Sequence, residues 1–169
     1  MDFLDLVKSR YSVRAYKNQA IEEEKLDKIL EAARLAPTAV NYQPFKLLII
    51  HTKGREKELK RIYQAEWFNK APIVICVCCE PKNAWVRRDG KNFADIDATI
   101  VMDHIILAAT SLGLGTCWIG AFDANAAREI LKIPEEIEPL VFTPIGYPAD
   151  EIGQKKRKNL SELVIYENW

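Results

Sequence analysis

The sequence lacks the features that mark several protein classes. Its 169 residues carry 24 basic and 24 acidic side chains, so it has no net positive charge of the kind that nucleic-acid-binding domains use. It contains no run of about 18 uncharged apolar residues, which a membrane-spanning helix needs. Its first residues do not form the basic stretch and apolar run of a secretory signal. We therefore expect a cytoplasmic protein with no nucleic-acid or membrane partner.

Metal ligands and catalytic histidines are also scarce. Three of the four cysteines fall in one predicted strand and the fourth in another, with no Cys-x-x-Cys pair: Cys76, Cys78, Cys79 and Cys117. This spacing does not match zinc or iron–sulfur sites, so we expect no metal and four reduced, buried thiols. The two histidines, His51 and His104, fall in a predicted strand and an apolar helix, where structural histidines are typical. We expect no catalytic side chain.

Nucleotide-binding motifs are missing as well. No Gly-x-x-x-x-Gly-Lys-Ser/Thr motif occurs, which excludes a P-loop. Gly113-Leu114-Gly115 begins like a dinucleotide fingerprint, but the next glycine is Gly120 and a helix precedes the motif instead of a strand. Repeats, low-complexity segments and linkers are absent, so we expect one domain over residues 1–169.

Hydrophobic periodicity predicts a mixture of helices and strands. We expect helices over residues 2–10, 22–35, 55–68, 96–112 and 124–132, and strands over 46–52, 73–79, 116–121 and 140–147. The first two strands are continuous apolar runs, which predicts burial on both faces of a sheet. Helix 96–112 is apolar nearly all round, as in a central or subunit-interface helix, and ends at Gly113 and Gly115. Residues 83–95 are polar without a clear period and predict a mobile loop.

Two basic segments are candidates for binding an anion. In an extended backbone, Arg10, Ser12 and Arg14 point to one side, and two guanidinium groups with a hydroxyl suit a phosphate. A solvated edge whose arginines meet nearby carboxylates explains the same pattern. The run Gln154-Lys155-Lys156-Arg157-Lys158 alone is more typical of a hydrated tail than of a ligand site.

A turn between two prolines, Pro37 and Pro44, carries several polar side chains. Thr38, Asn41 and Gln43 could pair with the edge of a planar heterocycle. They could equally satisfy the local backbone of a connection. The spacing alone leaves both interpretations open.

Taken together, five motifs in order resemble the nitroreductase family of FMN-dependent enzymes. They are Arg10-x-Ser12-x-Arg14, the 36–44 turn, the helix end 107–115, Pro144-x-Gly146-Tyr147-Pro148 and Lys155-x-Arg157-Lys158-x-Leu160, and the resemblance extends over about residues 3–163. It implies an α+β fold with a central, mostly antiparallel sheet flanked by helices. It also implies an intertwined homodimer with FMN at two interface sites.

The resemblance implies a set of cofactor contacts. Arg10, Ser12 and Arg14 would contact the phosphate, the ribityl chain and the isoalloxazine edge, and Lys155 and Arg157 the phosphate. The partner subunit would lay one turn against the flavin, with these residues: Pro37, Thr38, Ala39, Asn41 and Gln43. The segment expected near the reactive N5 atom is Trp118, Ile119 and Gly120. Asn69 loosely matches an asparagine that some relatives place on the ring.

The implied activity is ping-pong oxidoreduction, in which NADH or NADPH reduces FMN and a nitroaromatic, quinone or similar small acceptor takes the electrons. Trp85, Tyr42 and Phe93 are candidates for stacking on the substrate. Alternatives are a specialised flavin reaction, such as dehalogenation, enone reduction or metabolite oxidation, and a non-catalytic flavin-binding dimer. Asp95 and Asp97 make the start of helix 96–112 acidic, for which the sequence suggests no function.

Overall fold

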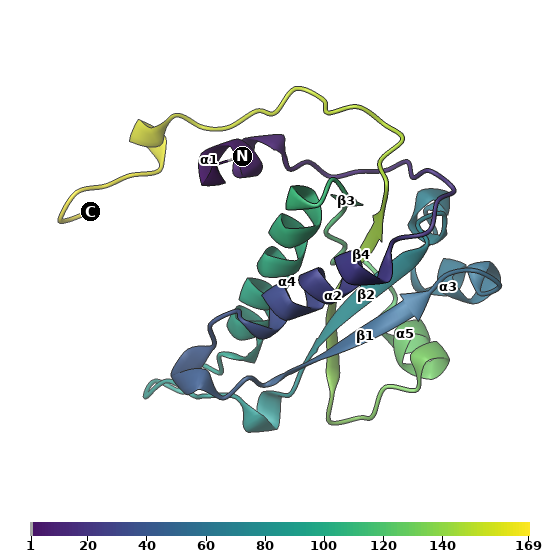
Figure 1. Cartoon of the computed structure of the whole chain (residues 1–169). Helices are drawn as coiled ribbons and strands as arrows, with labels where there is room; N and C mark the ends of the chain where they lie inside the picture. Colours follow the sequence, from purple (N-terminus) through teal and green to yellow (C-terminus); the bar gives the residue numbers. More distant parts are fainter. Residues whose placement is uncertain (1) are drawn as a thin grey trace.

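The computed structural model describes residues 2–169, which form an antiparallel sheet with helices on both faces (Figure 1). The strands lie in the order β1-β2-β4-β3, and each neighbouring pair is antiparallel. Their bounds are β1 Phe45–His51, β2 Ile73–Cys79, β3 Gly115–Thr116 and β4 Glu138–Gly146. This arrangement confirms the predicted α+β class.

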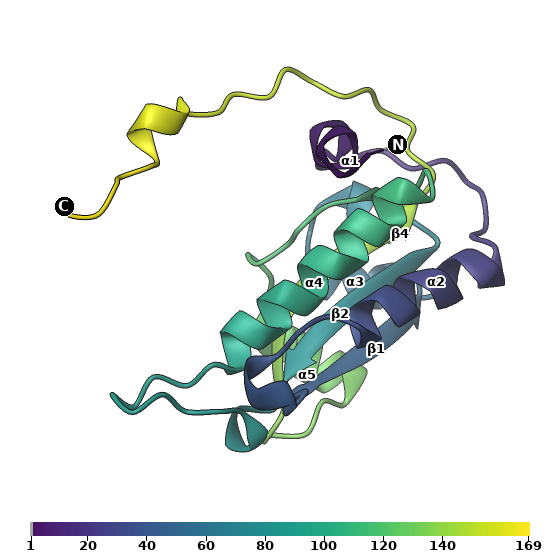
Figure 2. The same ribbon diagram turned by 60° about the vertical axis from the view of Figure 1, so that its left-hand side comes forward.

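Strand β2 forms the centre of the molecule, because all seven of its residues are buried. Alternate side chains point to opposite faces of a strand, so Ile73, Ile75 and Val77 join one apolar cluster while Val74 and Cys76 join another. Two helices cover each face (Figure 2). They are α2 Glu23–Arg34 and α4 Ala94–Ser111 on the first face, and α3 Glu56–Ile62 and α5 Ala124–Leu131 on the second.

Helix α4 runs the length of the sheet, and its inner and outer sides differ in burial. Its inner face is buried against the sheet and α2, whereas Ile96, Ile100 and Leu107 on its outer side are only half-buried. The short helix α1, Phe3–Ser9, lies beside the end of α4 that is nearer Ser111 (Figure 1). Helix α1 has no buried residue, and its apolar Phe3 and Leu4 are exposed.

Several predicted boundaries are wrong. The predicted helix 55–68 ends at Ile62, because Tyr63 is extended and a 3-10 turn, Glu66–Asn69, follows. The predicted strand 116–121 pairs regularly only as the two residues of β3, although Ile119 rejoins Phe142 of β4 through two backbone hydrogen bonds. Strand β1 lies at an edge of the described sheet and is only half-buried, so the expectation of burial on both faces holds for β2 alone.

The segment predicted as a mobile loop is a folded hairpin-like turn. Val86 pairs with Asn92, and the Arg87 guanidinium binds the Asp89 carboxylate at 2.9 and 2.6 Å. Gly90 adopts φ +87°, a left-handed conformation that glycine reaches without steric cost. The segment therefore has a defined shape.

After β4 the chain leaves the sheet and first pairs with residues 15–16. Residues 148–159 contain no helix or strand, and the last residues project past α1 in both views (Figures 1 and 2). Residues 160–169 expose a group of large apolar side chains: Leu160, Leu163, Val164, Ile165, Tyr166 and Trp169. Within residues 2–169, no helix combines the length and apolar character that crossing a membrane requires.

Candidate functional site

The segment Arg10–Arg14 is held against β3. Ser12 and Thr116 form a parallel bridge, and the Val13 amide donates a 2.9 Å hydrogen bond to the Thr116 carbonyl. A Cβ atom on Gly115 would lie 2.5 Å from Val13 Cγ2, so only glycine allows this approach. The tight packing of buried Val13 fixes the direction in which the flanking side chains project.

Asp150 joins this segment to the C-terminal part of the chain. Its Oδ2 atom accepts a 2.7 Å hydrogen bond from the Arg14 amide, and its carbonyl accepts a 2.8 Å bond from the Tyr11 hydroxyl. Burial and the neighbouring Asp150 charge raise the pKa of Tyr11, so its hydroxyl stays protonated and donates. These bonds bring the basic segment that follows Asp150 over residues 10–14.

A cavity of about 410 Å³ lies between the two segments. Besides Lys156, its lining includes four basic residues from opposite ends of the chain, namely Arg10, Arg14, Lys155 and Arg157, together with Ser12. Asp150 and Glu151 also line it, but none of these four cations forms an ion pair with a carboxylate of residues 2–169.

The charge environment of Lys155 is consistent with an anion site. Burial and the charges of Arg10 and Arg157 lower the pKa of Lys155, while its ammonium group donates to the Lys8 carbonyl. Like charges placed together repel each other unless an anion neutralises them. A phosphate group, which arginine and lysine bind through charge-assisted hydrogen bonds, fits this arrangement.

A second hollow of about 240 Å³ continues from the first, since Arg10, Tyr11 and Ser12 line both. Its remaining lining residues are Asp103 and Ile106 of α4, Thr116 of β3, and Trp118. The indole of Trp118 is 42% exposed, which leaves a flat aromatic surface at the rim. The combined depression is cationic at one end and partly apolar at the other.

The predicted segment 118–120 contributes unequally to this depression. Ile119 is buried in the core, and both of its backbone groups are bonded to Phe142, which anchors the segment to β4; its contact with a flavin stays a prediction. Gly120 is exposed, and a Cβ atom there would meet nothing within 4 Å. Its N–H group donates to no atom of residues 2–169, so it is available to a ligand.

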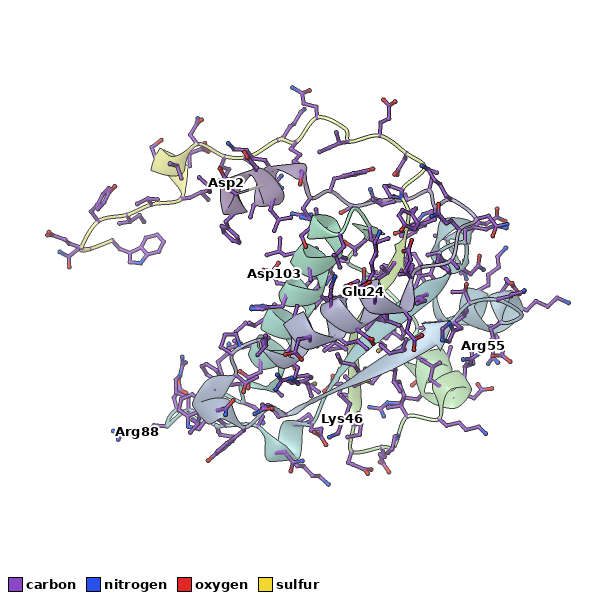
Figure 3. The ribbon with its side chains drawn as sticks, viewed as in Figure 1. Asp2, Glu24, Lys46, Arg55, Arg88 and Asp103 are labelled. Carbon is purple, nitrogen blue, oxygen red and sulfur yellow. The ribbon has the colours of Figure 1, made fainter. Side chains whose placement is uncertain are left out.

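The predicted turn residues do not join this depression within one chain. The Ala39 amide bonds to the Asp97 carboxylate near the start of α4, whereas Asp103 and Ile106 line the hollow further along the helix. Asp97 and Ile106 are about 13 Å apart along the axis at 1.5 Å per residue. Figure 3 shows the separation: Asp103 lies on the part of α4 nearer α1, and Arg88 lies beyond the opposite end. The predicted residues that therefore lie away from the depression are Pro37, Thr38, Ala39, Asn41 and Gln43.

The substrate candidates also lie away from the cavity. Trp85 and Phe93 pack edge to face with ring centroids 4.8 Å apart, in the hairpin-like turn before α4. Trp85 is half-buried, while Tyr42 is 57% exposed in the turn with Ala39. Asn69 donates to the Glu56 carbonyl at 3.2 Å and does not line either hollow.

Sequence reasoning missed several lining residues, among them Tyr11, Asp103, Thr116 and Asp150. The alternation rule assigned Tyr11 to the side away from the ligand, but the Arg10–Arg14 segment is edge-bonded by a single bridge, so its side chains do not alternate strictly. Asp103 is a charged residue within the mostly apolar helix 96–112. A charged residue there was the signal of a polar site.

Comparison with known proteins identifies a family that the sequence matches. The model described as "Nitroreductase family" matches residues 7–69 and 60–147. A relative from Methanothermobacter thermautotrophicus, whose name contains the words "NAD(P)H nitroreductase", is 32% identical across 92% of this chain and 82% of the relative.

Solved structures show the same fold. A nitroreductase family protein from Clostridium difficile 630 is 39% identical with a TM-score of 0.90, covering 100% of both chains. An FMN-dependent nitroreductase from Clostridium difficile R20291 is 30% identical with a TM-score of 0.80, covering 99% of this chain and 100% of that one. The similarity therefore includes both hollows and the turn at the other end of α4.

Proposed function

The chain belongs to the nitroreductase family, and from that premise we propose that it is an FMN-dependent NAD(P)H oxidoreductase that reduces nitroaromatics, quinones and related flat acceptors. The observation that carries this proposal is the convergence of Arg10, Arg14, Lys155 and Arg157 on one cavity without ion-pair partners among residues 2–169. A phosphorylated cofactor explains why these cations lie together.

The residues present fit FMN. Desolvation and the neighbouring charges of Arg10 and Arg157 lower the pKa of Lys155, and a phosphate dianion would offset the charge repulsion; the cavity opens into a less polar hollow with the partly exposed Trp118. Arg10, Lys155 and Arg157 would hold the phosphate. The Ser12 hydroxyl would bind the ribityl chain.

FMN, when bound, supplies the electron carrier that takes hydride from NAD(P)H and passes electrons to the acceptor. The protein would orient it and tune its charge. The Arg14 guanidinium would stabilise negative charge at the ring edge, and the Gly120 N–H group would donate to the ring from open space. Trp118 would support flat acceptors at the rim. Donor and acceptor would occupy the same space in turn, which predicts ping-pong kinetics.

We propose a homodimer because one chain holds the turn and the cation cavity at opposite ends of α4. Two copies of α4 packed antiparallel across a two-fold axis would place each turn at the partner's cavity. Half-buried Ile96, Ile100 and Leu107 would lie in that interface. Exposed apolar residues of α1 and the C-terminal segment provide further surface for a second copy to cover.

Purified protein tests the proposed function directly. A yellow preparation that NAD(P)H bleaches and menadione recolours is the expected result, with parallel double-reciprocal lines in steady state. Intersecting lines would contradict the ping-pong mechanism. A bound flavin that NAD(P)H never reduces would indicate a binding dimer, and protein that cannot be loaded with FMN would refute both flavin-based functions.

A further inference from the structure

Asp97 is a buried carboxylate with one oxygen that lacks a hydrogen-bond partner among residues 2–169. It lies on α4, is 1% exposed, and stands among apolar neighbours such as Ala94, Ala98 and Val101. Oδ1 accepts a 2.8 Å hydrogen bond from the Ala39 amide, whereas Oδ2 has no hydrogen-bond partner among residues 2–169. Burial of a carboxylate with an unsatisfied oxygen is costly, so its contribution to stability does not explain its presence.

The turn that Asp97 holds has a strained backbone. Val40, Asn41 and Gln43 all have positive φ, at 55°, 58° and 52°, which side chains other than glycine rarely adopt. For a β-branched residue such as Val40 this conformation is an outlier. Strained backbone of this kind persists only where surrounding contacts over-determine it, and it is concentrated at binding and catalytic sites.

Few contacts are available to hold this turn. Within it, the Thr38 hydroxyl accepts a 3.0 Å bond from the Gln43 amide, the Gln43 side chain donates a 3.1 Å bond to Asn41 Oδ1, and two backbone bonds of 3.0 and 3.2 Å close the 3-10 turn. Val40 and Tyr42 are 62% and 57% exposed, so their side chains do not anchor it. The Asp97 carboxylate is therefore the contact that ties the start of the turn to the rigid helix α4.

We propose that Asp97 is a positioning residue: it presents the turn 37–43 in the conformation that completes the flavin site of the partner subunit. This role rests on the proposed split site and adds to it a residue that would not touch the flavin. It also gives a function to the acidic start of α4. Asp95, in the same first turn, is exposed and makes no hydrogen bond to the turn 37–43.

Three variants separate positioning from a general effect of charge. Asp97→Ala removes the acceptor and should weaken FMN binding about tenfold, measured by quenching of flavin fluorescence. Asp97→Asn keeps an oxygen for the Ala39 amide and should restore affinity to within about threefold of the unmodified protein. Asp95→Asn changes the same charge in the same helical turn and should leave FMN affinity unchanged.

A hybrid dimer tests whether the effect passes between subunits. One protomer carries Arg10→Ala and Arg157→Ala, and the other carries Asp97→Ala. If the turn acts on the partner's site, the hybrid has one site with intact cations and an intact turn, so it should bind one FMN with unmodified affinity. If Asp97 only supports its own chain, both sites are damaged and the hybrid binds no better than its parents, which overturns the proposal.

The proposal and the function it rests on can fail separately. Unmodified protein that does not bind FMN would refute the proposed function. Unmodified protein that binds FMN, with equal affinity in Asp97→Ala, would refute only the positioning role. Urea unfolding monitored by circular dichroism identifies a variant that fails to fold, and in that case Asp97→Leu, which also removes the acceptor for the Ala39 amide but fills the buried volume, replaces Asp97→Ala in the hybrid.

Discussion

Substitution of Lys155 by alanine tests the phosphate site most directly. A hydrogen bond to a charged group contributes about 1.5–3 kcal/mol. Because Lys155 is only half-buried and water screens its charge, we take the lower end of this range, about 1.5 kcal/mol. At about 1.4 kcal/mol per factor of ten, Lys155→Ala should raise the dissociation constant of FMN about tenfold.

The matched control is Lys158→Ala, which removes the same side chain three residues later, outside the lining of the cavity. Fluorescence titration with FMN and with riboflavin, which lacks the phosphate, distinguishes the contact from a distant charge effect. Lys155→Ala should weaken FMN but leave riboflavin unchanged, and Lys158→Ala should change neither by more than about twofold at physiological salt, where charges are screened over about 8 Å. Equal losses in the two variants, or an equal loss for riboflavin, would refute the placement of the phosphate.

Three further predictions concern pH, packing and the thiols. In free protein the pKa of Lys155 is lowered, whereas a bound phosphate would raise it, so FMN affinity should fall as the pH rises through this lowered pKa towards the ordinary lysine value; this fall should be smaller in Lys155→Ala. Gly115→Ala should lower the free energy of unfolding by about 1–3 kcal/mol, measured in urea, because its Cβ would overlap Val13, whereas Gly153→Ala, with open space around it, should change little; equal effects would contradict the packing argument. All four cysteines are buried, and burial with nearby carboxylates raises the pKa of Cys79 to about 12, so a thiol reagent at pH 8 should label none in native protein and four in urea; rapid native labelling would count against this burial.

The elements predicted best were those whose local pattern agrees with their environment. The run Ile73–Cys79 matched β2 at both ends, because a central strand buried on both faces needs apolar residues throughout. The predicted helix 124–132 is α5, and Asp123 caps it because its carboxylate accepts a 2.9 Å bond from the Ala126 amide. Arg10, Ser12, Arg14, Lys155 and Arg157 were placed as candidates for one site, and the structure brings them to one cavity.

Other features depend on contacts that no local pattern contains. Leu59, Ile62, Tyr63 and Trp67 have helical spacing, but α3 ends at Ile62 and the aromatic pair reaches the same core from an extended residue and a 3-10 turn. Strand β3 is short because the Cys117 amide turns to the Thr143 hydroxyl instead of the strand backbone.

The hairpin-like turn at 86–92 could have been predicted. Its Asp89-Gly90 pair is a strong signal for a tight turn between pairing segments. The position of the turn 37–43 relative to the cations could not, because it requires the length and direction of α4.

Because the turn and the cavity are separated along α4, FMN binding would depend on the concentration of the chain. If each complete site exists only in the dimer, FMN binds the dimer and not the separated chain, so it must lower the dimer dissociation constant by linkage. Dilution would then release cofactor and subunits together, and reconstitution would depend on the second power of the chain concentration. The flavin content of a sample would therefore measure the fraction of chains that are in dimers.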